Sequence, residues 1–178
     1  MYCDSVVRIG LLTLLLSVFL GCSQPVPVSP TPPASLPPAP ITSVVKVHDG
    51  DTIIVLFQNT SQRLRLAGID CPESDQLYGT EASETTKALA LNREVTVTPT
   101  TTDRYGPIVA EVTLQDGRSL SHELVKVGAC WWYRKYAVND VELQRLETEA
   151  HTQRLGLWAT ESPLSPWEWR AQRRNATK

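Results

Sequence analysis

The sequence has little net charge and only one sizeable apolar run. Its 178 residues carry a formal net charge of −2. No bulk positive field therefore attracts polyanions, and any polyanion site must be a local patch. The apolar run, residues 9–20, is too short for a helix that spans a membrane. Internal repeats are absent. A hydrophobic content of 42% with 20% charged residues is typical of a globular chain, and the length suits one domain with extensions.

Cysteine is also scarce, and one of the four cysteines follows the apolar run. Residues 1–22 have the pattern of a secretory signal: a basic residue, a short apolar segment, and small Gly21 before Cys22. The last four residues resemble a bacterial lipobox, in which the cysteine becomes lipid-modified, although Phe19 replaces the usual small aliphatic residue. The alternatives are an ordinary signal peptide cleaved elsewhere and an uncleaved anchor. We favour lipidation at Cys22, which predicts an exported protein, anchored at the cell envelope or secreted.

Charged residues are missing from residues 23–40, which are rich in Pro, Ser and Ala. Proline blocks helix and sheet and favours extended chain, so we interpret residues 23–43 as a linker. It is either a tether to a membrane surface or a disordered leader without a task. At the other end, residues 161–178 form a Trp-containing basic tail with four cations against two anions. This tail can contact anionic lipid or nucleic acid. We favour another interpretation, in which the two tryptophans of the tail pack back on the domain and the last residues are disordered.

Residues 44–160 have the patterns of one folded domain. Period-two alternation and β-rich runs predict strands at residues 44–47, 52–57, 63–69, 94–98 and 108–114. Helical spacing predicts three helices, at residues 80–91, 119–127 and 138–154. We expect the first to be capped by Thr80, and the others to face inward at Leu120, Leu124, Val127, Val138, Val141, Leu146 and Ala150. The order of elements predicts a mainly β, α+β fold: a small barrel with helices packed on it.

The strands at residues 52–57 and 63–69 can bring charged side chains together. As a hairpin, they place Asp51 near Asp70 at one end of the sheet, with Arg65 and Glu73 close by. Two carboxylates suit a hard divalent cation, and a guanidinium suits a phosphate. A glutamate after a turn fixed by proline is a candidate general base. Together they fit phosphodiester hydrolysis, whereas the Asp-Gly turn alone indicates only a solvated loop.

Two cysteines, Cys71 and Cys130, lie in the folded part. Export permits a disulfide between them, but spacing cannot show that they are close enough, and we favour two free buried thiols. Residues 130–136 then join aromatic rings to cations, an arrangement that can stack bases and hold phosphates. We expect Trp131 and Trp132 to be buried, because side chains of that size usually are, while Tyr133 and Tyr136 suit either role.

Several short motifs follow one another in order between residues 44 and 159. They are Asp-Gly-Asp-Thr at 49–52, Arg-Leu-Ala-Gly-Ile-Asp-Cys-Pro-Glu at 65–73, Tyr-Gly-Thr-Glu-Ala at 78–82, Thr-Asp-Arg-Tyr-Gly at 102–106, Glu-Leu-Val-Lys-Val-Gly at 123–128 and Gly-Leu-Trp at 156–158. As an ordered set they resemble the thermonuclease (staphylococcal nuclease-like) family. The resemblance implies a five-stranded OB-fold barrel with helices, and Ca²⁺-dependent hydrolysis of DNA and RNA.

The resemblance also implies roles for individual residues. Asp51 and Asp70 correspond to the Ca²⁺ carboxylate ligands, and Cys71 would add its backbone carbonyl. Arg65 corresponds to the arginine that binds the scissile phosphate, and Glu73 to the proposed general base. Tyr105 corresponds to a tyrosine near a substrate phosphate, and Arg104 to a loop cation. With Tyr133, which comes from the aromatic segment at residues 130–136 and not from the resemblance, they are the candidate substrate-binding residues.

The motif at residues 102–106 departs from the family at its next position. There the family has a second catalytic arginine, and this sequence has Pro107, which carries neither charge nor backbone donor. An arginine that neutralises a phosphoryl transition state contributes on the order of 10³–10⁵ in rate. Either the activity is much weakened, or another cation replaces the missing one. Arg104 is nearest in sequence, whereas Arg118 and Arg134 cannot be placed.

Three functions remain open at this point. The first is an exported Ca²⁺-dependent nuclease, favoured because a pure scaffold has no need of the carboxylates, Arg65 and Glu73. The second is a catalytically inactive OB module that binds nucleic acid or protein at the cell envelope, which Pro107 favours. The third is a lipid-tethered barrel with only a structural role. For the nuclease we expect a DNA or RNA substrate, a membrane contact through the N-terminal lipid, and a monomer.

Overall fold

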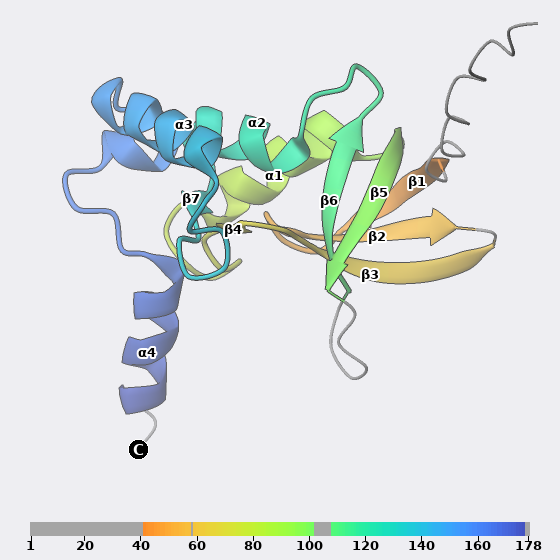
Figure 1. The fold of residues 1–178 in the computed structure, drawn as a ribbon. Helices are drawn as coiled ribbons and strands as arrows, with labels where there is room; N and C mark the ends of the chain where they lie inside the picture. Colours follow the sequence, from red (N-terminus) through yellow and green to blue (C-terminus); the bar gives the residue numbers. More distant parts are fainter. Residues whose placement is uncertain (1–40, 58, 102–107, 177–178) are drawn as a thin grey trace, which may run out of the picture. The chain divides into compact units, whose positions relative to one another are not determined.

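The computed structural model describes residues 41–57, 59–101 and 108–176, in which most strands come early in the chain and most helices late (Figure 1). These residues belong to one compact unit, Pro37–Lys178. The strands are β1 (Ile41–Val47), β2 (Thr52–Phe57), β3 (Thr60–Leu66), β4 (Ile69–Asp70), β5 (Glu94–Thr101), β6 (Ile108–Leu114) and β7 (Trp131–Trp132). The helices are α1 (Gly79–Ala90), α2 (Leu120–Lys126), α3 (Val141–Thr152), the short 3₁₀ helix η1 (Gly156–Ala159) and α4 (Pro166–Ala176). Within the described residues, no helix has the length and apolarity that a membrane span requires.

Five strands close into a barrel in the order β1–β2–β3–β6–β5, which confirms the predicted barrel. The β2–β3 hairpin has the expected alternation: Leu64 and Leu66 are buried, while Arg63 is exposed and Arg65 is half-buried. The pairing of β3 with β6 is parallel, and the other barrel pairings are antiparallel. The barrel therefore holds one face of the hairpin in the core and presents the other at the surface.

The predicted strand at residues 63–69 is wrong at both ends. β3 begins earlier, at Thr60, and stops at Leu66, because Gly68 adopts a positive φ of 76° that breaks the extended chain. The next two residues form β4, which leaves the barrel and pairs antiparallel with β7. The first strand of the barrel also begins earlier than expected, at Ile41.

The three predicted helices exist, with differences in their details. The residue before α1 is Tyr78, in the left-handed region at φ 72°, so Thr80 lies inside the helix and is not its cap. Ser119 and Asp140 cap α2 and α3 through side-chain hydrogen bonds to backbone N–H groups. The expected inward faces are corrected at three valines, Val127, Val138 and Val141, which are exposed. Each lies beside a helix end: Val127 follows α2, Val138 precedes the cap of α3, and Val141 opens α3, so neighbouring turns do not cover them.

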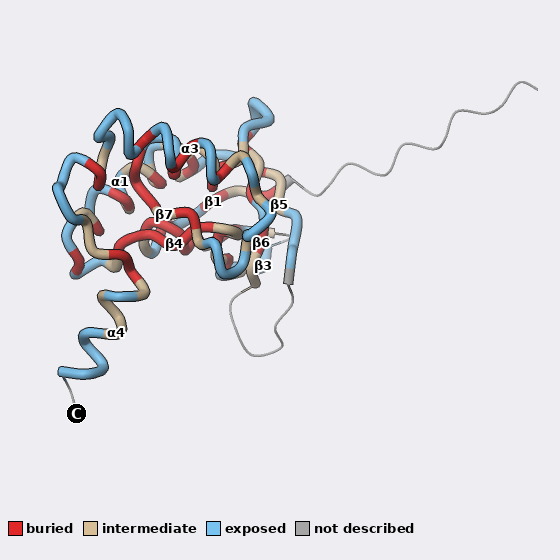
Figure 2. The backbone as a smooth tube through the Cα atoms, turned by 60° about the vertical axis from the view of Figure 1, so that its left-hand side comes forward, coloured by how far each residue is buried: buried red, intermediate tan, exposed pale blue. Residues whose placement is uncertain are grey.

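The main core is formed by residues of the barrel strands and of helices α1, α2 and α3. The buried parts of the chain are red in Figure 2. The largest fully buried side chains of the main core include Ile53, Leu64, Leu66, Leu124 and Leu143. Burying each such side chain contributes about 1.5–3 kcal/mol. A smaller cluster under η1 contains Ala150, Leu157 and Trp158, with Trp131 packed against it. Strands β4 and β7 run between the two clusters, which fixes the position of Asp70 at the end of β4.

A fourth α-helix, α4, runs through most of the C-terminal tail, so the expectation of disordered last residues is wrong as far as Ala176. It begins beside β4 and β7 and extends away from the barrel (Figures 1 and 2). Ser165 precedes it, Pro166 is its first residue, and the Glu168 carboxylate accepts hydrogen bonds from the Ser165 backbone N–H (3.3 Å) and hydroxyl (2.6 Å). This Ser-Pro-x-Glu pattern is a helix-start signal that was readable in the sequence. The expected return of Trp167 onto the domain is confirmed by its contacts with Trp131 and Tyr133.

Candidate active site

The hairpin and β4 bring Asp51, Arg65 and Asp70 together, as the sequence indicated. Thr52 pairs with Arg65 across the hairpin, so Asp51 lies at the end of β3. The Asp51 carbonyl accepts a 2.8 Å hydrogen bond from the Leu66 N–H, which extends this pairing. The turn at Gly68 then returns the chain so that Asp70 faces the same guanidinium.

Arg65 bridges the two carboxylates. Its Nη1 lies 2.9 Å from Asp51 Oδ1, and its Nη2 lies 2.6 Å from Asp70 Oδ1. The second oxygen of Asp51 accepts a 2.9 Å hydrogen bond from the Cys71 backbone N–H, and Oδ1 also accepts one from the Thr52 hydroxyl. Both carboxylates are almost completely buried, whereas the Arg65 side chain is 30% exposed. The Arg65 side chain is therefore accessible from solvent although both of its partners are buried.

Burial dominates the electrostatics of Asp51. It raises the pKa of this carboxyl group from 3.8 to about 7, and the charge of Arg65 only partly opposes the effect. For Arg65, burial lowers the pKa, but the charges of Asp51 and Asp70 outweigh it and raise the pKa overall. The site thus holds two buried acidic groups against one guanidinium from the barrel, and it favours additional positive charge.

Glu73 lies in the loop after β4, between the disulfide-bonded Cys71 and helix α1. Its backbone N–H donates to Gln76 Oε1 (3.2 Å), and its carboxylate is 37% exposed. The start of α1 packs tightly on this loop: a Cβ added to Gly79 would lie 1.9 Å from the Glu73 carbonyl oxygen. The absence of a side chain at Gly79 therefore allows the helix to support the loop that carries Glu73.

Arg170 from α4 completes the cluster, although no motif of the sequence indicates a role for it. Its Nη2 lies 2.6 Å from Asp70 Oδ2, and its Nη1 lies 2.7 Å from Glu73 Oε1. These hydrogen bonds to Asp70 and Glu73 raise the pKa of Arg170 against the opposing effect of burial. The helix-start pattern at Ser165 predicts that Trp167 and Arg170 share a helical face, but nothing in the sequence locates that face at Asp70.

The prediction of two free thiols is wrong, because Cys71 and Cys130 form a disulfide. The reason lies in the pairing of β4 with β7. Asp70 is paired with Trp131 in antiparallel register, so Cys71, which follows β4, stands opposite Cys130, which precedes β7. The bond ties the candidate metal-ligating segment to the strand that carries the aromatic cluster. The contact was not predictable from spacing, because 59 positions separate the two cysteines.

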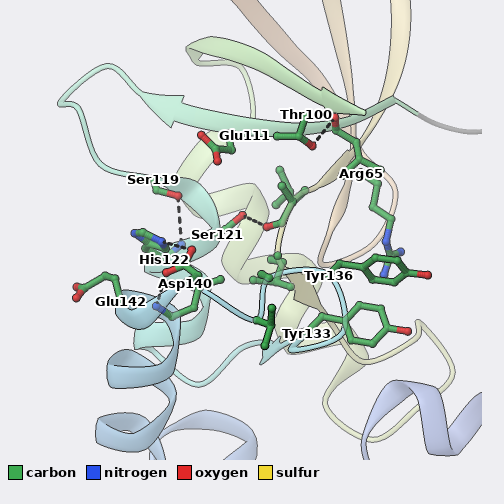
Figure 3. Close-up of a pocket in the computed structure, with 18 of the residues that line it drawn as sticks. Arg65, Thr100, Glu111, Ser119, Ser121, His122, Tyr133, Tyr136, Asp140 and Glu142 are labelled. Atoms are coloured by element: carbon green, nitrogen blue, oxygen red, sulfur yellow. Dashed lines mark hydrogen bonds and ion pairs between the residues drawn. The ribbon is translucent and has the colours of Figure 1, made fainter. Parts of the chain in front are cut away.

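A cavity of about 1290 Å³ opens beside this cluster. Arg65, Glu73 and Arg170 line it, together with Tyr133 and the exposed Tyr136. One face of Tyr133 is stacked on Trp167, with the ring planes 3° apart, and its edge contacts Tyr136. Figure 3 shows Arg65, Tyr133 and Tyr136 at one end of the cavity, and Ser119, His122, Asp140 and Glu142 at the other. The cavity therefore joins a guanidinium and two rings to a polar far end.

The remaining aromatic and cationic candidates lie elsewhere. Trp132 is buried as expected, and Trp131 is half-buried. Arg118 pairs with Asp116 and Glu123, and Arg134 pairs with Glu147. Neither arginine reaches the carboxylate cluster in these contacts. The expected residues Cys22, Arg104, Tyr105 and Pro107 lie outside the described residues.

Comparison with known proteins agrees with this geometry. The family described as Staphylococcal nuclease homologue matches residues 63–160. An Escherichia coli protein described as an uncharacterized endonuclease is 42% identical over 127 residues, which cover 71% of this chain and 82% of that protein. A micrococcal nuclease of Shigella flexneri is 38% identical over 143 residues, covering 75% and 82%, respectively. A staphylococcal-like nuclease of Arabidopsis thaliana is 38% identical over 126 residues, 68% of this chain but 38% of that protein. The chain therefore belongs to the staphylococcal nuclease family.

Proposed function

We propose that the cluster of Asp51, Asp70, Arg65 and Glu73 is the active centre of a Ca²⁺-dependent nuclease that hydrolyses phosphodiester bonds of DNA or RNA. That the chain is a nuclease, a hydrolase of the endonuclease type, follows from its family. The observation that carries the assignment to this cluster is Arg65, whose guanidinium is bonded to both buried carboxylates and whose side chain lines the cavity.

The donor set suits Ca²⁺ in kind. Asp51 and Asp70 are buried carboxylates held next to each other by one guanidinium, and carboxylate oxygens are the ligands this hard cation prefers. Within the described residues, no group of three or more His, Cys, Asp or Glu side chains is arranged to hold a metal ion. The two aspartates and the Cys71 backbone carbonyl would hold the ion, and water would complete its coordination. When bound, the ion supplies positive charge against a phosphoryl oxygen.

Arg65 and Glu73 divide the remaining chemistry between them. The partly exposed Arg65 side chain can donate hydrogen bonds from its guanidinium group to the oxygens of a phosphate. The Glu73 carboxylate faces the same cavity and is exposed enough to contact water. It takes a proton from that water as the water oxygen bonds to phosphorus. The bridging P–O bond then breaks, and the leaving oxygen takes a proton from solvent.

The aromatic end of the cavity suits the bases of a nucleic acid. Tyr136 is 71% exposed, so a base can stack on its ring. Tyr133 has one face covered by Trp167, which leaves its hydroxyl group and its other face as the surfaces for substrate. Arg104 and Tyr105, outside the described residues, are proposed from the resemblance as further phosphate contacts.

Hydrolysis assays on labelled single-stranded DNA, duplex DNA and RNA test this proposal. We expect cleavage with Ca²⁺ and loss of cleavage when a chelator removes the ion, with recovery when Ca²⁺ is added back. Equal rates with and without the chelator would refute the metal requirement. Binding of single-stranded DNA without cleavage under any condition would refute the enzyme and favour a non-catalytic binding module.

We further propose that the protein is exported and anchored through lipid on Cys22. The signal pattern of residues 1–22 and the charge-free linker support this location. The Cys71–Cys130 disulfide agrees with it, because such bonds persist in oxidising compartments.

A further inference from the structure

Arg170 reaches the proposed active centre from a helix nearly one hundred residues further along the chain. Its guanidinium makes a paired contact with Asp70, with Nη2 2.6 Å from Oδ2 and Nη1 3.2 Å from Oδ1, and Nη1 also lies 2.7 Å from Glu73. The Arg170 side chain is 33% exposed and lines the same cavity as Arg65 and Glu73. This arginine is thus both tied to the acidic groups and accessible to a ligand.

The position of Arg170 is fixed by contacts along the segment that carries it. Trp167, one helical turn earlier, stacks on Tyr133 with ring centroids 5.3 Å apart and contacts Trp131 edge-on. Before the helix, the Leu164 carbonyl accepts a 2.6 Å hydrogen bond from Gln76, the residue that also bonds the Glu73 backbone. After Arg170, Arg173 forms an ion pair with Asp75. The helix is therefore held to the Glu73 loop on both sides of Arg170.

Two guanidinium groups consequently meet at one carboxylate. Asp70 Oδ1 accepts hydrogen bonds from Arg65 Nη2 and from Arg170 Nη1. Their charges repel each other, and this repulsion is offset when negative charge is placed between them. A phosphate in the cavity offers the same paired oxygen acceptors as the Asp70 carboxylate does here.

We propose that Arg170 is a catalytic residue, a second phosphate-binding guanidinium that α4 delivers opposite Arg65. This inference rests on the proposed nuclease function of the cluster. In the proposed reaction, the paired donors of Arg170 contact the non-bridging oxygens of the scissile phosphate. They stabilise the negative charge that develops on these oxygens as water attacks. The contact with Glu73 holds the guanidinium beside the base that activates this water. Two other described arginines were candidates for the missing catalytic cation, Arg118 and Arg134. Their ion pairs are with Asp116, Glu123 and Glu147, and not with Asp70 or Glu73.

The test compares steady-state kinetics of the full chain with those of R170A, R170K and R174A on a short single-stranded DNA in saturating Ca²⁺. Arg174 is an exposed cation on the same helix and is the matched control. We expect R170A to lower kcat by roughly 10²–10³-fold, with a smaller change in KM. R170K should restore only part of the rate, because an ammonium cannot reproduce the planar pair of donors. R174A should match the parent.

A rescue experiment tests the same role chemically. Guanidinium ion, added at concentrations far below those that denature the protein, should raise the rate of R170A and leave the rate of the parent unchanged.

Four results would overturn the inference. R170A as fast as the parent shows that Arg170 is not needed, and R170A faster than the parent shows that α4 blocks the site instead. A structural role is shown if R170A is slow, is not rescued by guanidinium ion, and has a lower melting temperature than the parent. If R170K keeps full activity, positive charge alone suffices and the paired donors are not needed. E73Q separates these failures from failure of the proposed function. If the parent and E73Q hydrolyse DNA equally, or neither does, the cluster is not the active centre and Arg170 has no catalytic role.

Discussion

At the scale of single residues, the chemistry depends on two buried carboxylates held by one guanidinium. Asp51 and Asp70 contribute charge, and Arg65 links them, so each side chain keeps the others in place. Removing one partner of a buried charge pair leaves the other unpaired, which costs about 3–5 kcal/mol. A variant at this cluster must therefore be examined for folding as well as for function.

Asp51→Ala should weaken Ca²⁺ binding strongly, because it removes one of the two carboxylates proposed as ligands. Isothermal calorimetry on the folded variant measures this directly. Asp116→Ala is a matched control, since Asp116 is an exposed aspartate that pairs with Arg118, away from the carboxylate cluster. An Asp51→Ala protein with the Ca²⁺ affinity of the parent would contradict the metal assignment.

Residue-scale sequence reasoning identified Asp51, Arg65 and Asp70 because hairpin geometry is local. Thr52 and Arg65 are paired across one turn, so alternation alone places these charges at one end of the sheet. It failed at Arg170 and at the disulfide, whose contacts join segments that are distant in the sequence and depend on how β4, β7 and α4 pack. Pattern and spacing carry no information about such packing.

At the scale of elements, the short sheet of β4 and β7 connects the barrel to the helices. Glu147 of α3 accepts a 3.0 Å hydrogen bond from the Trp132 N–H, and the Tyr133 N–H donates to the Gly68 carbonyl at 2.8 Å. The disulfide joins the two strands at the end nearest Asp70. The geometry of the proposed metal ligands thus depends on two strands of two residues each.

Breaking the disulfide should therefore lower both stability and activity. For a separation of 59 residues, loss of the cross-link should reduce the free energy of unfolding by about 2–4 kcal/mol. Chemical denaturation of the oxidised and reduced protein measures the difference, and the double variant Cys71→Ala/Cys130→Ala is insensitive to reductant and serves as the control. Identical unfolding midpoints for the oxidised protein and the double variant would show that the bond does not contribute.

At the scale of the whole molecule, the fold was the most predictable feature, and the ends of the chain were the least. The predicted strands correspond to the five barrel strands, because alternation over five to eight residues is a strong local signal. For the C-terminal segment the sequence predicts only a basic tail with tryptophans that pack back on the domain, because the partners of its tryptophans and cations lie outside the segment. In the structure those partners are Tyr133, Asp70, Glu73 and Asp75.

The proposed lipid anchor makes a prediction for the full chain in its native host. Cys22→Ser should move the protein from the membrane fraction to the soluble fraction, because the acyl chains can no longer attach. Immunoblots of fractionated cells measure the distribution. If the variant stays with the membrane as the parent does, residues 1–22 act as an uncleaved anchor or the lipobox assignment is wrong.

The central claim is that this cluster, with Glu73 as the base, hydrolyses phosphodiester bonds. Its most direct test is the single-turnover rate of single-stranded DNA cleavage by the full chain and by Glu73→Gln, in saturating Ca²⁺. Glutamine keeps the shape of the side chain but cannot take a proton, so the rate should fall by roughly 10²–10⁴-fold, while DNA binding, Ca²⁺ binding and melting temperature stay close to those of the parent. A Glu73→Gln protein that cleaves as fast as the parent would contradict the claim.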